Sequence, residues 1–526
     1  MMATNSGDRQ AEIRSYVARP FGLFWELVQL QSGVSPDKAA LICDDHRLTY
    51  RELVTSTDRI ATALQGDGVG RGGTVAIAAA MSIDYVTIFL ATLRTGAAVA
   101  PLSPSATPAQ LANMLADAGA SHLILDRTGS AAFGSASPGV RRIAIGDGLD
   151  GEPLADWIAP EGSIPAAVEI EPEDPFNIIY SSGTTGTPKG IVQSHAMRWP
   201  QCYLVDPPGF GPDSVTLLST PLYSNTTLVA LLPALAGGGT VVLMPKFEAH
   251  GFLELSERHH VTHAMLVPVQ YRRIVDNPKF DRFDLSSYVM KFATSAPFAG
   301  ELKAEVLSRW PGGLTEYYGM TEGGGSCMLL AHLHPDKLHT VGPPIPGHEM
   351  LVIDEDGRVL PPGEAGEVVG RSRAMMNGYR NQPGLTAEAE WYSPAGERYI
   401  RTGDVARMDA DGFFTLVGRK KDMIISGGIN IYPVDLEAAL VEHPSVREAA
   451  VVGAPSQRWG ETPVGFVALH AGEHITGEAL KDWANAKLGK MQRLADVQIV
   501  DELPRSAIGK VLKRELRDRV AELAVS

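Results

Sequence analysis

Residues 180–190, YSSGTTGTPKG, are the stretch of the chain with the strongest structural signal. The apolar run 176–179 before it predicts a strand, and we expect a helix to begin after it. The glycines allow a tight turn that exposes backbone N–H groups, while Ser and Thr hydroxyls and Lys189 add donors and positive charge. The stretch predicts a phosphate-binding loop, with an ordinary Gly/Ser/Thr-rich loop as the alternative. It is not a Walker A loop, because Gly190 follows Lys189 where Ser or Thr would be needed.

Outside this loop, apolar runs of strand length alternate with segments of helical spacing. Strands are expected over residues 75–80 and 122–125, and helices over residues 49–64 and 109–118. This alternation predicts an α/β architecture with mostly parallel sheets.

The sequence changes in character near residue 420. A polar junction, GRKKD at 418–422, precedes a short apolar run and then Ser426-Gly427-Gly428. A chain of 526 residues is too long for one compact core. We therefore predict a large N-terminal domain over 1–420, with stacked sheets and helices, and a small mobile C-terminal α/β domain over 421–526. A surface loop inside one domain is the alternative explanation of the junction.

Composition limits the classes of function. The 46 Lys and Arg against 61 Asp and Glu give a net charge of −15, which disfavours a broad grip on nucleic acid or anionic lipid. Three scattered cysteines do not predict a disulfide framework or a structural zinc site. No apolar segment has the length of a signal peptide or a membrane span, so we expect a cytoplasmic protein without stable membrane association.

Four further motifs follow the loop in order. They are YGMTE at 318–322, RTGD at 401–404, GRKKDMIISGGINIYPVDLE at 418–437 and PRSAIGK at 504–510. Together with the loop they resemble the motifs of the adenylate-forming superfamily, which contains acyl-CoA synthetases, peptide-synthetase adenylation domains and luciferases. The resemblance implies an AMP-forming carboxylic acid:CoA ligase that works in two steps through an acyl-adenylate, with ATP, Mg²⁺ and coenzyme A as cofactors.

The resemblance also implies roles for individual residues. Glu322 would hold Mg²⁺, and Thr321 would donate to the α-phosphate. Asp404 would accept both ribose hydroxyls with Arg419 in support. Lys510 would bridge the carboxylate and phosphate oxygens as they react. Taken without the motifs, Glu322 is a surface carboxylate, Asp404 a turn residue and Lys510 an exposed lysine.

Further residues of these motifs are expected to surround the reactants. The other expected catalytic residues are Thr184 and Lys189. The remaining expected contacts to nucleotide or CoA are Ser181, Ser182, Gly183, Thr185, Gly186, Thr187, Ser295, Ala296, Pro297, Glu316, Tyr317, Tyr318, Gly319, Met320, Ser426, Gly427 and Gly428. In the family the C-terminal domain swings about a hinge residue, here Lys421, between the two half-reactions.

The identity of the acid substrate must be inferred from positions at which family members that use different acids carry different residues. Ser224 stands where peptide-synthetase domains carry the aspartate that pairs with an amino group, so an amino acid is not expected. Gly319 stands where acetate-type enzymes carry tryptophan, and Tyr317 where malonate-type enzymes carry arginine. The expected pocket residues are Tyr223, Ser224, Asn225, Tyr317, Gly319, Gly323 and Gly324, with the last two leaving space opposite Tyr317.

A benzoate or phenylpropenoate fits these positions best, and a medium- or long-chain fatty acid is the alternative. One departure from the family lies nearby, since Thr294-Ser295 stands where relatives often have a glycine pair. A luciferase-like oxygenase, a carrier-protein-loading enzyme and a nucleotide binder without catalysis would carry similar motifs. The expected partners are the acid, ATP and CoA, and a homodimer is left open.

Overall fold

The computed structural model describes residues 6–134, 139–181, 188–202, 209–426, 429–489, 492–506 and 509–523. The chain divides into two compact units. Unit 1 comprises Met1–Leu338, Ile345–Glu349 and Arg371–Ile400, and unit 2 comprises His339–Pro344, Met350–Gly370 and Arg401–Ser526. The predicted domain boundary after residue 420 and the hinge at Lys421 stay predictions.

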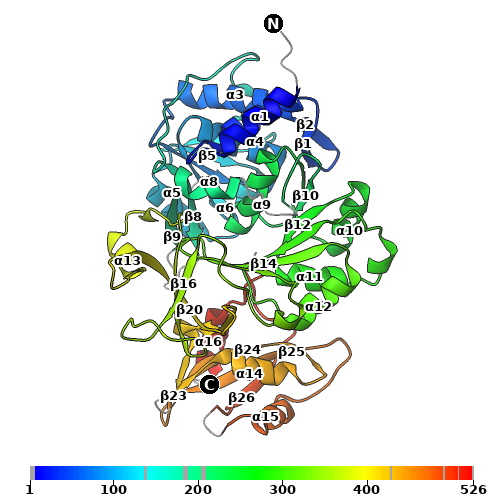
Figure 1. Cartoon of the computed structure of the whole chain (residues 1–526), viewed down its shortest axis with the longest axis vertical. Coiled ribbons are helices and arrows are strands. Elements are labelled where there is room, and N and C mark those ends of the chain that lie inside the picture. Colours follow the sequence, from blue (N-terminus) through cyan, green and yellow to red (C-terminus); the bar gives the residue numbers. More distant parts are fainter. Residues whose placement is uncertain are drawn as a thin grey trace. The chain divides into compact units, whose positions relative to one another are not determined.

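Unit 1 is built on two eight-stranded, mostly parallel sheets (Figure 1). The first sheet has the order β15 (Cys327–Leu330), β14 (Gly313–Tyr318), β13 (Met290–Ala293), β12 (His263–Leu266), β10 (Val215–Leu218), β11 (Thr240–Leu243), β1 (Ala39–Cys43), β2 (His46–Thr49). Its two edge pairs are antiparallel and its inner pairs are parallel.

The second sheet carries the glycine-rich loop. Its order is β18 (Gly378–Tyr379), β9 (Lys189–Ser194), β8 (Pro175–Ser181), β4 (Ala98–Pro101), β3 (Thr74–Ala78), β5 (His122–Leu125), β6 (Arg141–Ala144), β7 (Glu152–Pro153). The pairs β18–β9 and β9–β8 are antiparallel, and the pairs from β8 to β7 are parallel. The predicted α/β class with mostly parallel sheets is confirmed.

Helices α1 (Ser6–Val17) and α2 (Phe24–Val34) of unit 1 precede the first strand, and its other helices lie between strands. These other helices are α3 (Tyr50–Gly66), α4 (Ile83–Arg94), α5 (Pro108–Ala118), α6 (Arg127–Phe133), α7 (Leu154–Trp157), α8 (His195–Cys202), α9 (Asn225–Ala236), α10 (Ala249–Arg258), α11 (Pro268–Val275), α12 (Gly300–Arg309) and α13 (Pro383–Glu388), with 3₁₀ turns at Phe280–Arg282 and Pro335–Lys337.

Local sequence accounts for the elements that were predicted. The five residues of β3 are all buried, as expected for a central parallel strand. Helix α3 begins at a capping box, in which Thr49 accepts from the Glu52 N–H and Glu52 accepts from the Thr49 N–H. Helix α5 ends at Gly119 in the left-handed conformation. The three predicted strands are confirmed as β3, β5 and β8, and the predicted helices over 49–64 and 109–118 as α3 and α5.

The prediction of a helix directly after the glycine-rich loop was wrong. Residues Lys189–Ser194 form β9, which runs antiparallel to β8 and sets Ser181 opposite Lys189 and Tyr180 opposite Gly190. A short apolar run does not by itself distinguish a buried strand from the start of a helix. Here Gly190–Ser194 is buried throughout, between β8 and β18, and helix α8 begins only at His195.

Unit 2 ends in a small α/β arrangement. Its sheet has the order β23 (Ile429–Ile431), β22 (Ile424–Ser426), β25 (Gly460–Leu469), β24 (Val446–Ser456), with β26 (Asp496–Ile499) beside β25. Its helices are α14 (Pro433–Val441), α15 (Gly477–Asn485) and α16 (Lys513–Leu523). Because side chains alternate along β24, Val451 belongs to the cluster with Leu436 and Leu480, and Val452 to the cluster with Leu516.

A further sheet precedes it in the chain. This sheet has the order β16 (Glu349–Ile353), β17 (Ala365–Arg371), β20 (Arg398–Met408), β19 (Glu390–Tyr392), with β21 (Phe414–Arg419) also paired to β20 and followed by a 3₁₀ turn at Lys420–Asp422. The small C-terminal α/β part of the predicted fold is confirmed.

A buried ion pair joins α12 to the first sheet. The Nζ atom of Lys303 on α12 lies 2.5 Å from Oε2 of Glu316 on β14, and the two side chains are 1% and 5% exposed. Lys303 also donates to the Leu338 carbonyl at 2.7 Å. Burial raises the pKa of Glu316 to about 7, although the charge of Lys303 acts in the opposite direction. The buried Glu316 carboxylate therefore depends on the charge of Lys303 to offset the free-energy cost of its burial.

We predict that Lys303→Met lowers the free energy of unfolding by about 3–5 kcal/mol near neutral pH, because it leaves Glu316 buried without a cation. A carboxyl whose folded pKa is raised keeps its proton at low pH, so this loss should grow as pH rises through the folded pKa. Urea unfolding at a series of pH values measures it. The double variant Lys303→Met/Glu316→Gln should recover most of the loss, and a pH-independent, unrecovered loss would contradict this account.

Candidate active site

The glycine-rich loop connects two antiparallel strands. Ser181 ends β8 and Lys189 begins β9, and the two residues are opposite each other in the register. The predicted loop residues Ser182, Gly183, Thr184, Thr185, Gly186 and Thr187 lie outside the described residues, and their roles stay predictions. The structure therefore defines the two ends of the predicted phosphate loop.

Lys189 and Glu322 both contact Tyr379. The Nζ atom of Lys189 lies 5.1 Å from the centre of the Tyr379 ring. The Tyr379 hydroxyl donates to Oε1 of Glu322 at 2.8 Å. Burial, then the adjacent carboxylate, raise the pKa of Tyr379 well above its ordinary value, so the hydroxyl keeps the proton that it donates. Two predicted catalytic residues are thus brought together by a tyrosine that the sequence analysis missed.

A buried polar network holds the backbone of Thr321. Gln193 of β9 donates from Nε2 to the Thr321 carbonyl at 2.6 Å. Asn177 Nδ2 donates to Gln193 Oε1 at 2.8 Å, and Arg198 Nε donates to Asn177 Oδ1 at 3.0 Å. These three side chains are completely buried, and burial lowers the pKa of Arg198 to about 9. Because each polar group is hydrogen-bonded to the next, the network fixes Thr321 relative to β8, β9 and α8.

Gly323 allows a close approach of two backbone segments. Its φ is +77°, and a Cβ at this position would lie 2.0 Å from the Ala374 carbonyl oxygen. Gly324 donates its N–H to the same carbonyl at 3.0 Å. The Ala374 backbone occupies the space that a side chain at Gly323 would need, and the pocket roles expected of Gly323 and Gly324 stay predictions. Gly323 is needed there for conformation and for close contact.

The remaining residues of the YGMTE motif lie on or just after β14. Tyr318 is buried, whereas the Glu316 side chain is engaged by Lys303. A Cβ on Gly319 would lie 2.7 Å from the Ser326 hydroxyl, so little room exists for a larger residue. The nucleotide contacts expected of Glu316, Tyr318, Gly319 and Met320 stay predictions.

Tyr317 belongs to an aromatic stack with Phe292 and Phe210. Its ring lies 6.0 Å from the Phe292 ring at 27°, and Phe292 lies 5.4 Å from Phe210, also at 27°. Tyr317 is partly exposed, whereas Phe292 is buried. Near-parallel rings of this kind form a flat apolar surface.

A separate set of polar groups lies at the start of α9. Ser224 is the N-cap of the helix and accepts from the Thr226 N–H at 3.3 Å. The hydroxyls of Thr226 and Ser295 are 2.5 Å apart. Oδ1 of Asn225 is buried, and among the described residues it has no hydrogen-bond partner. A buried polar atom without a protein partner points to a missing ligand or water.

Ser295 holds a backbone conformation that favours glycine. Its φ is +80°, at the position where relatives often carry the second glycine of a pair. Such a conformation costs about 1–2 kcal/mol for a residue with a Cβ. The bond to Thr226 helps to hold it. The loop continues with Ala296, which is half-buried, and Pro297, which is exposed. Their expected nucleotide contacts stay predictions. The pocket role of Tyr223 also stays a prediction.

In unit 2, Asp404 and Arg419 are paired. They are opposite each other on β20 and β21, and Arg419 Nε donates to Asp404 Oδ1 at 2.8 Å. Oε2 of Glu367 forms ion pairs with Arg401, at 2.7 Å, and with Nζ of Lys420, at 3.1 Å. The guanidinium therefore orients the carboxylate that is predicted to bind the ribose, and the ribose role itself stays a prediction.

Lys510 lies in a narrow turn. Ser506 donates its N–H to the Lys510 carbonyl at 2.8 Å, and Gly509 has a φ of +76°. Arg505 donates to the Gly509 carbonyl at 2.7 Å and also pairs with Glu448. The exposed Lys510 side chain is thus carried on a closed backbone turn.

Three residues were predicted to line the CoA route. Ser426 is buried on β22, and Gly427 and Gly428 lie outside the described residues.

Glu322 fits a magnesium ion that arrives with a phosphate ligand. Mg²⁺ is usually bound through one or two carboxylates together with substrate phosphates and water. Within the ranges that the structure describes, no group of three or more His, Cys, Asp or Glu side chains could hold a metal by itself. When bound there, Mg²⁺ would neutralise phosphate charge.

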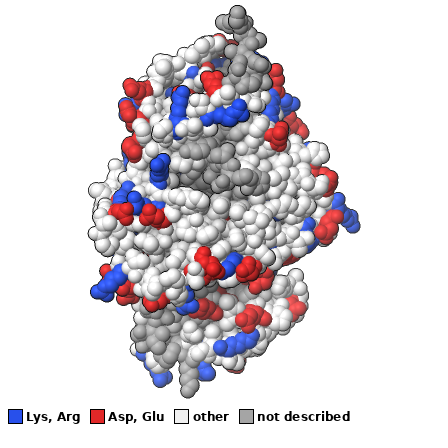
Figure 2. Space-filling model, viewed as in Figure 1, with Lys and Arg blue, Asp and Glu red and all other residues white. Residues whose placement is uncertain are grey.

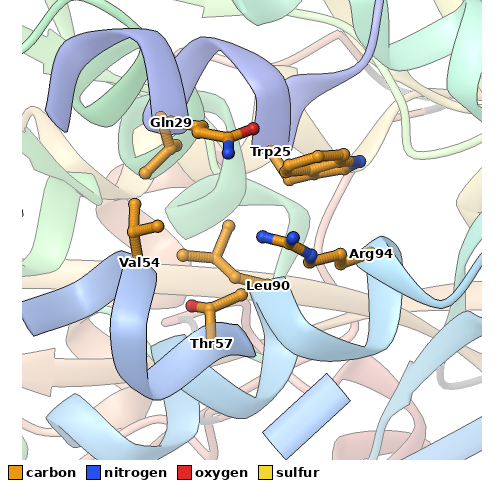
Figure 3. A pocket seen from close by; sticks show the side chains of 7 residues that line it. Trp25, Gln29, Val54, Thr57, Leu90 and Arg94 are labelled. Atoms are coloured by element: carbon orange, nitrogen blue, oxygen red, sulfur yellow. The ribbon is translucent and has the colours of Figure 1, made fainter. Parts of the chain in front are cut away.

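A small hollow between α2, α3 and α4 is separate from these residues. Figure 3 shows Trp25, Val54, Thr57, Leu90 and Arg94 pointing toward one another around it. Its volume is about 10 Å³, which is room for one water molecule. It is therefore too small for the acid or the nucleotide.

The described surface and helices add two observations. On the face shown in Figure 2, acidic and basic side chains are interspersed, and neither sign gathers into one large patch. Among the described helices, none combines the length and the apolar character needed to cross a bilayer.

Comparison with known proteins identifies the family. The AMP-binding enzyme family matches residues 28–380, and the AMP-binding enzyme C-terminal domain matches residues 435–510. The first match covers more than half of the chain, so the chain belongs to the AMP-binding enzyme family, the adenylate-forming superfamily that its motifs resemble.

Relatives of this chain act on several acids and acceptors. It is 32% identical over 516 residues to an indoleacetate–CoA ligase of Aromatoleum aromaticum, covering 94% of this chain and 98% of that one. It is similar to the solved anthranilate CoA ligase AuaEII in complex with anthranoyl-AMP, with a TM-score of 0.86, 25% identity and coverage of 99% and 100%. It is also similar to the amide bond synthetase McbA from Marinactinospora thermotolerans, with a TM-score of 0.84, 29% identity and coverage of 94% and 99%.

These findings place the protein among adenylate-forming enzymes of the acyl-CoA ligase type, which bind ATP and an acid substrate. Among the described residues of unit 1, those that carry the predicted adenylation chemistry are Lys189, Thr321 and Glu322. The structure connects all three to β9 or to Tyr379.

We predict that Gly323→Ala lowers both the free energy of unfolding and ATP binding. Its Cβ would overlap the Ala374 carbonyl and push the Thr321–Glu322 turn away from Tyr379. Gly347→Ala is the matched control, because Gly347 has a φ of +81° but no atom within 4 Å of the added Cβ. The control should lose about 1–2 kcal/mol of stability from its backbone conformation alone. Thermal unfolding and ATP titration compare the two, and equal effects would contradict the assignment of Gly323.

Proposed function

We propose that this chain is an ATP-dependent, AMP-forming carboxylic acid:CoA ligase that acts on an aromatic acid with a polar substituent, such as a hydroxylated benzoate or phenylpropenoate. The observation that carries the choice of acid is the flat aromatic surface of Tyr317 and Phe292, together with the buried Oδ1 of Asn225, which has no hydrogen-bond partner among the described residues. The stack supplies a flat apolar surface, and Asn225 supplies a polar group for a ring substituent.

The names of the relatives support the same class of acid. The indoleacetate–CoA ligase and the anthranilate CoA ligase both act on acids that carry an aromatic ring. A fatty acid remains the alternative, but the bulk of Tyr317 and the Ser295–Thr226 hydroxyl pair are poorly suited to an apolar chain.

In the proposed first half-reaction, a carboxylate oxygen of the acid attacks the α-phosphorus of ATP. The bond from the α-phosphorus to the bridging oxygen breaks, and pyrophosphate leaves. Lys189 and Lys510 offset the negative charge that gathers on the phosphates, and Thr321 donates to the α-phosphate. Asp404, oriented by Arg419, binds the ribose hydroxyls. In the second half-reaction, the CoA thiolate attacks the acyl carbon and AMP leaves.

A second candidate keeps the first half-reaction and changes the acceptor. The similarity to an amide bond synthetase favours considering an amine in place of CoA. The residues of unit 1 described above act on ATP and the acid, so they serve either acceptor. The acceptor must therefore be decided by experiment.

We predict CoA-dependent AMP release with aromatic acids in a panel that also contains fatty acids and dicarboxylic acids. Aromatic acids should give the highest kcat/KM, and Lys510→Ala should lower adenylation at least a hundredfold, since it removes a charge that acts in the transition state. If AMP release required an amine or a carrier protein instead of CoA, the proposal that CoA is the acceptor would be wrong. A clear preference for fatty acids would overturn the proposed acid.

We further predict that Asn225→Ala selectively impairs acids with a hydroxyl or amino substituent. Their kcat/KM should fall about tenfold or more relative to the unsubstituted acid, because a polar group in the pocket loses its partner. Steady-state kinetics with matched acid pairs measure the ratio. A uniform loss for both members of each pair would instead assign Asn225 a purely structural role.

A further inference from the structure

One backbone segment, residues 374–380, is hydrogen-bonded to both predicted ATP-binding loops. On one side, Met376 donates to the Glu322 carbonyl at 2.8 Å. On the other side, Arg380 donates to the Gly190 carbonyl at 2.7 Å, next to Lys189, and β18 pairs with β9. The segment therefore links the turn that carries Glu322 to the strand that carries Lys189.

Tyr379 is the side chain of this segment that contacts both charged residues. Its ring faces Lys189, with 5.1 Å from Nζ to the ring centre, and its hydroxyl donates to Glu322 at 2.8 Å. The Tyr379 N–H donates to the Thr386 hydroxyl at 2.9 Å, which fixes the backbone from which the ring projects. The backbone that carries the ring is therefore held by α13 and by β9 together.

This arrangement determines whether Lys189 and Glu322 pair with each other before a ligand binds. A lysine and a glutamate that pair directly neutralise each other, and that pair must break before either group can serve another partner. Within the part of the chain that the structure describes, Lys189 and Glu322 form no direct ion pair, and each contacts Tyr379 instead. A carboxylate also has a second oxygen with which to bind a cation while Oε1 accepts from the hydroxyl.

We propose that Tyr379 is a positioning residue of the ATP site. Its ring keeps Lys189 apart from Glu322, and its hydroxyl orients the Glu322 carboxylate, so that the cation remains available to phosphate and the carboxylate to Mg²⁺. This inference rests on the proposed function and adds to it a residue that keeps the unliganded site ready for magnesium and ATP.

Two substitutions separate the hydroxyl from the ring. Tyr379→Phe removes the hydroxyl and keeps the ring, so the Mg²⁺ concentration for half-maximal binding of a non-hydrolysable ATP analogue should rise about tenfold, and excess Mg²⁺ should restore binding. Tyr379→Leu also removes the ring and allows Lys189 to reach Glu322, so affinity should stay reduced even at saturating Mg²⁺. Isothermal titration calorimetry without acid or CoA measures both effects without turnover.

Tyr392→Phe is the matched control. Tyr392 is an exposed tyrosine of the same unit, and its hydroxyl also donates to a carboxylate, Glu390, at 2.9 Å. This variant should bind the analogue as wild type does. A Tyr379→Phe variant with the wild-type Mg²⁺ requirement would overturn the inference, as would a loss of binding that excess Mg²⁺ does not restore. If wild type itself bound the analogue without any dependence on Mg²⁺, the magnesium role predicted for Glu322 would fail instead.

Discussion

The pairing of β9 along both of its edges is the constraint on which the rest of the candidate site depends. On one edge, β8 fixes the two ends of the glycine-rich loop, with Ser181 opposite Lys189. On the other edge, β18 brings in Tyr379 from a distant part of the sequence. The side chain of Gln193 then reaches from the same strand to the Thr321 carbonyl. Because strand register fixes all of these positions at once, a shift of β9 by one residue would displace the phosphate loop, the tyrosine and the Thr321–Glu322 turn together.

The sequence predicts those features that depend on local chemistry. The α/β class, the buried strands β3 and β5 and the helices α3 and α5 follow from apolar periodicity and from capping residues such as Thr49. The strand after the glycine-rich loop was not predicted, because six residues of mixed character do not reveal that both edges will be paired. Tyr379 and the tight contact at Gly323 were missed for a related reason, since each depends on a backbone segment far away in the sequence.

The two halves of the candidate site rest on different signals. The residues predicted to bind ATP belong to the motifs by which the chain resembles its family, whereas Asn225, Thr226 and Ser295, which bear on the choice of acid, lie outside those motifs. Ser295 holds a strained backbone conformation beside Thr226, Tyr317 stacks on Phe292, and Asn225 has a buried oxygen without a partner among the described residues. Backbone strain that the surroundings maintain tends to be found at functional sites. The proposed choice of an aromatic, polar-substituted acid rests on these three features.

The most direct test of the account is acid-dependent exchange of labelled pyrophosphate into ATP in the absence of CoA. This exchange reports formation of the acyl-adenylate alone, before any acceptor takes part. The account predicts exchange that requires both Mg²⁺ and an aromatic acid. Exchange without any acid, or no exchange with any aromatic acid while the protein still binds ATP, would contradict the central claim that this site adenylates an aromatic carboxylate.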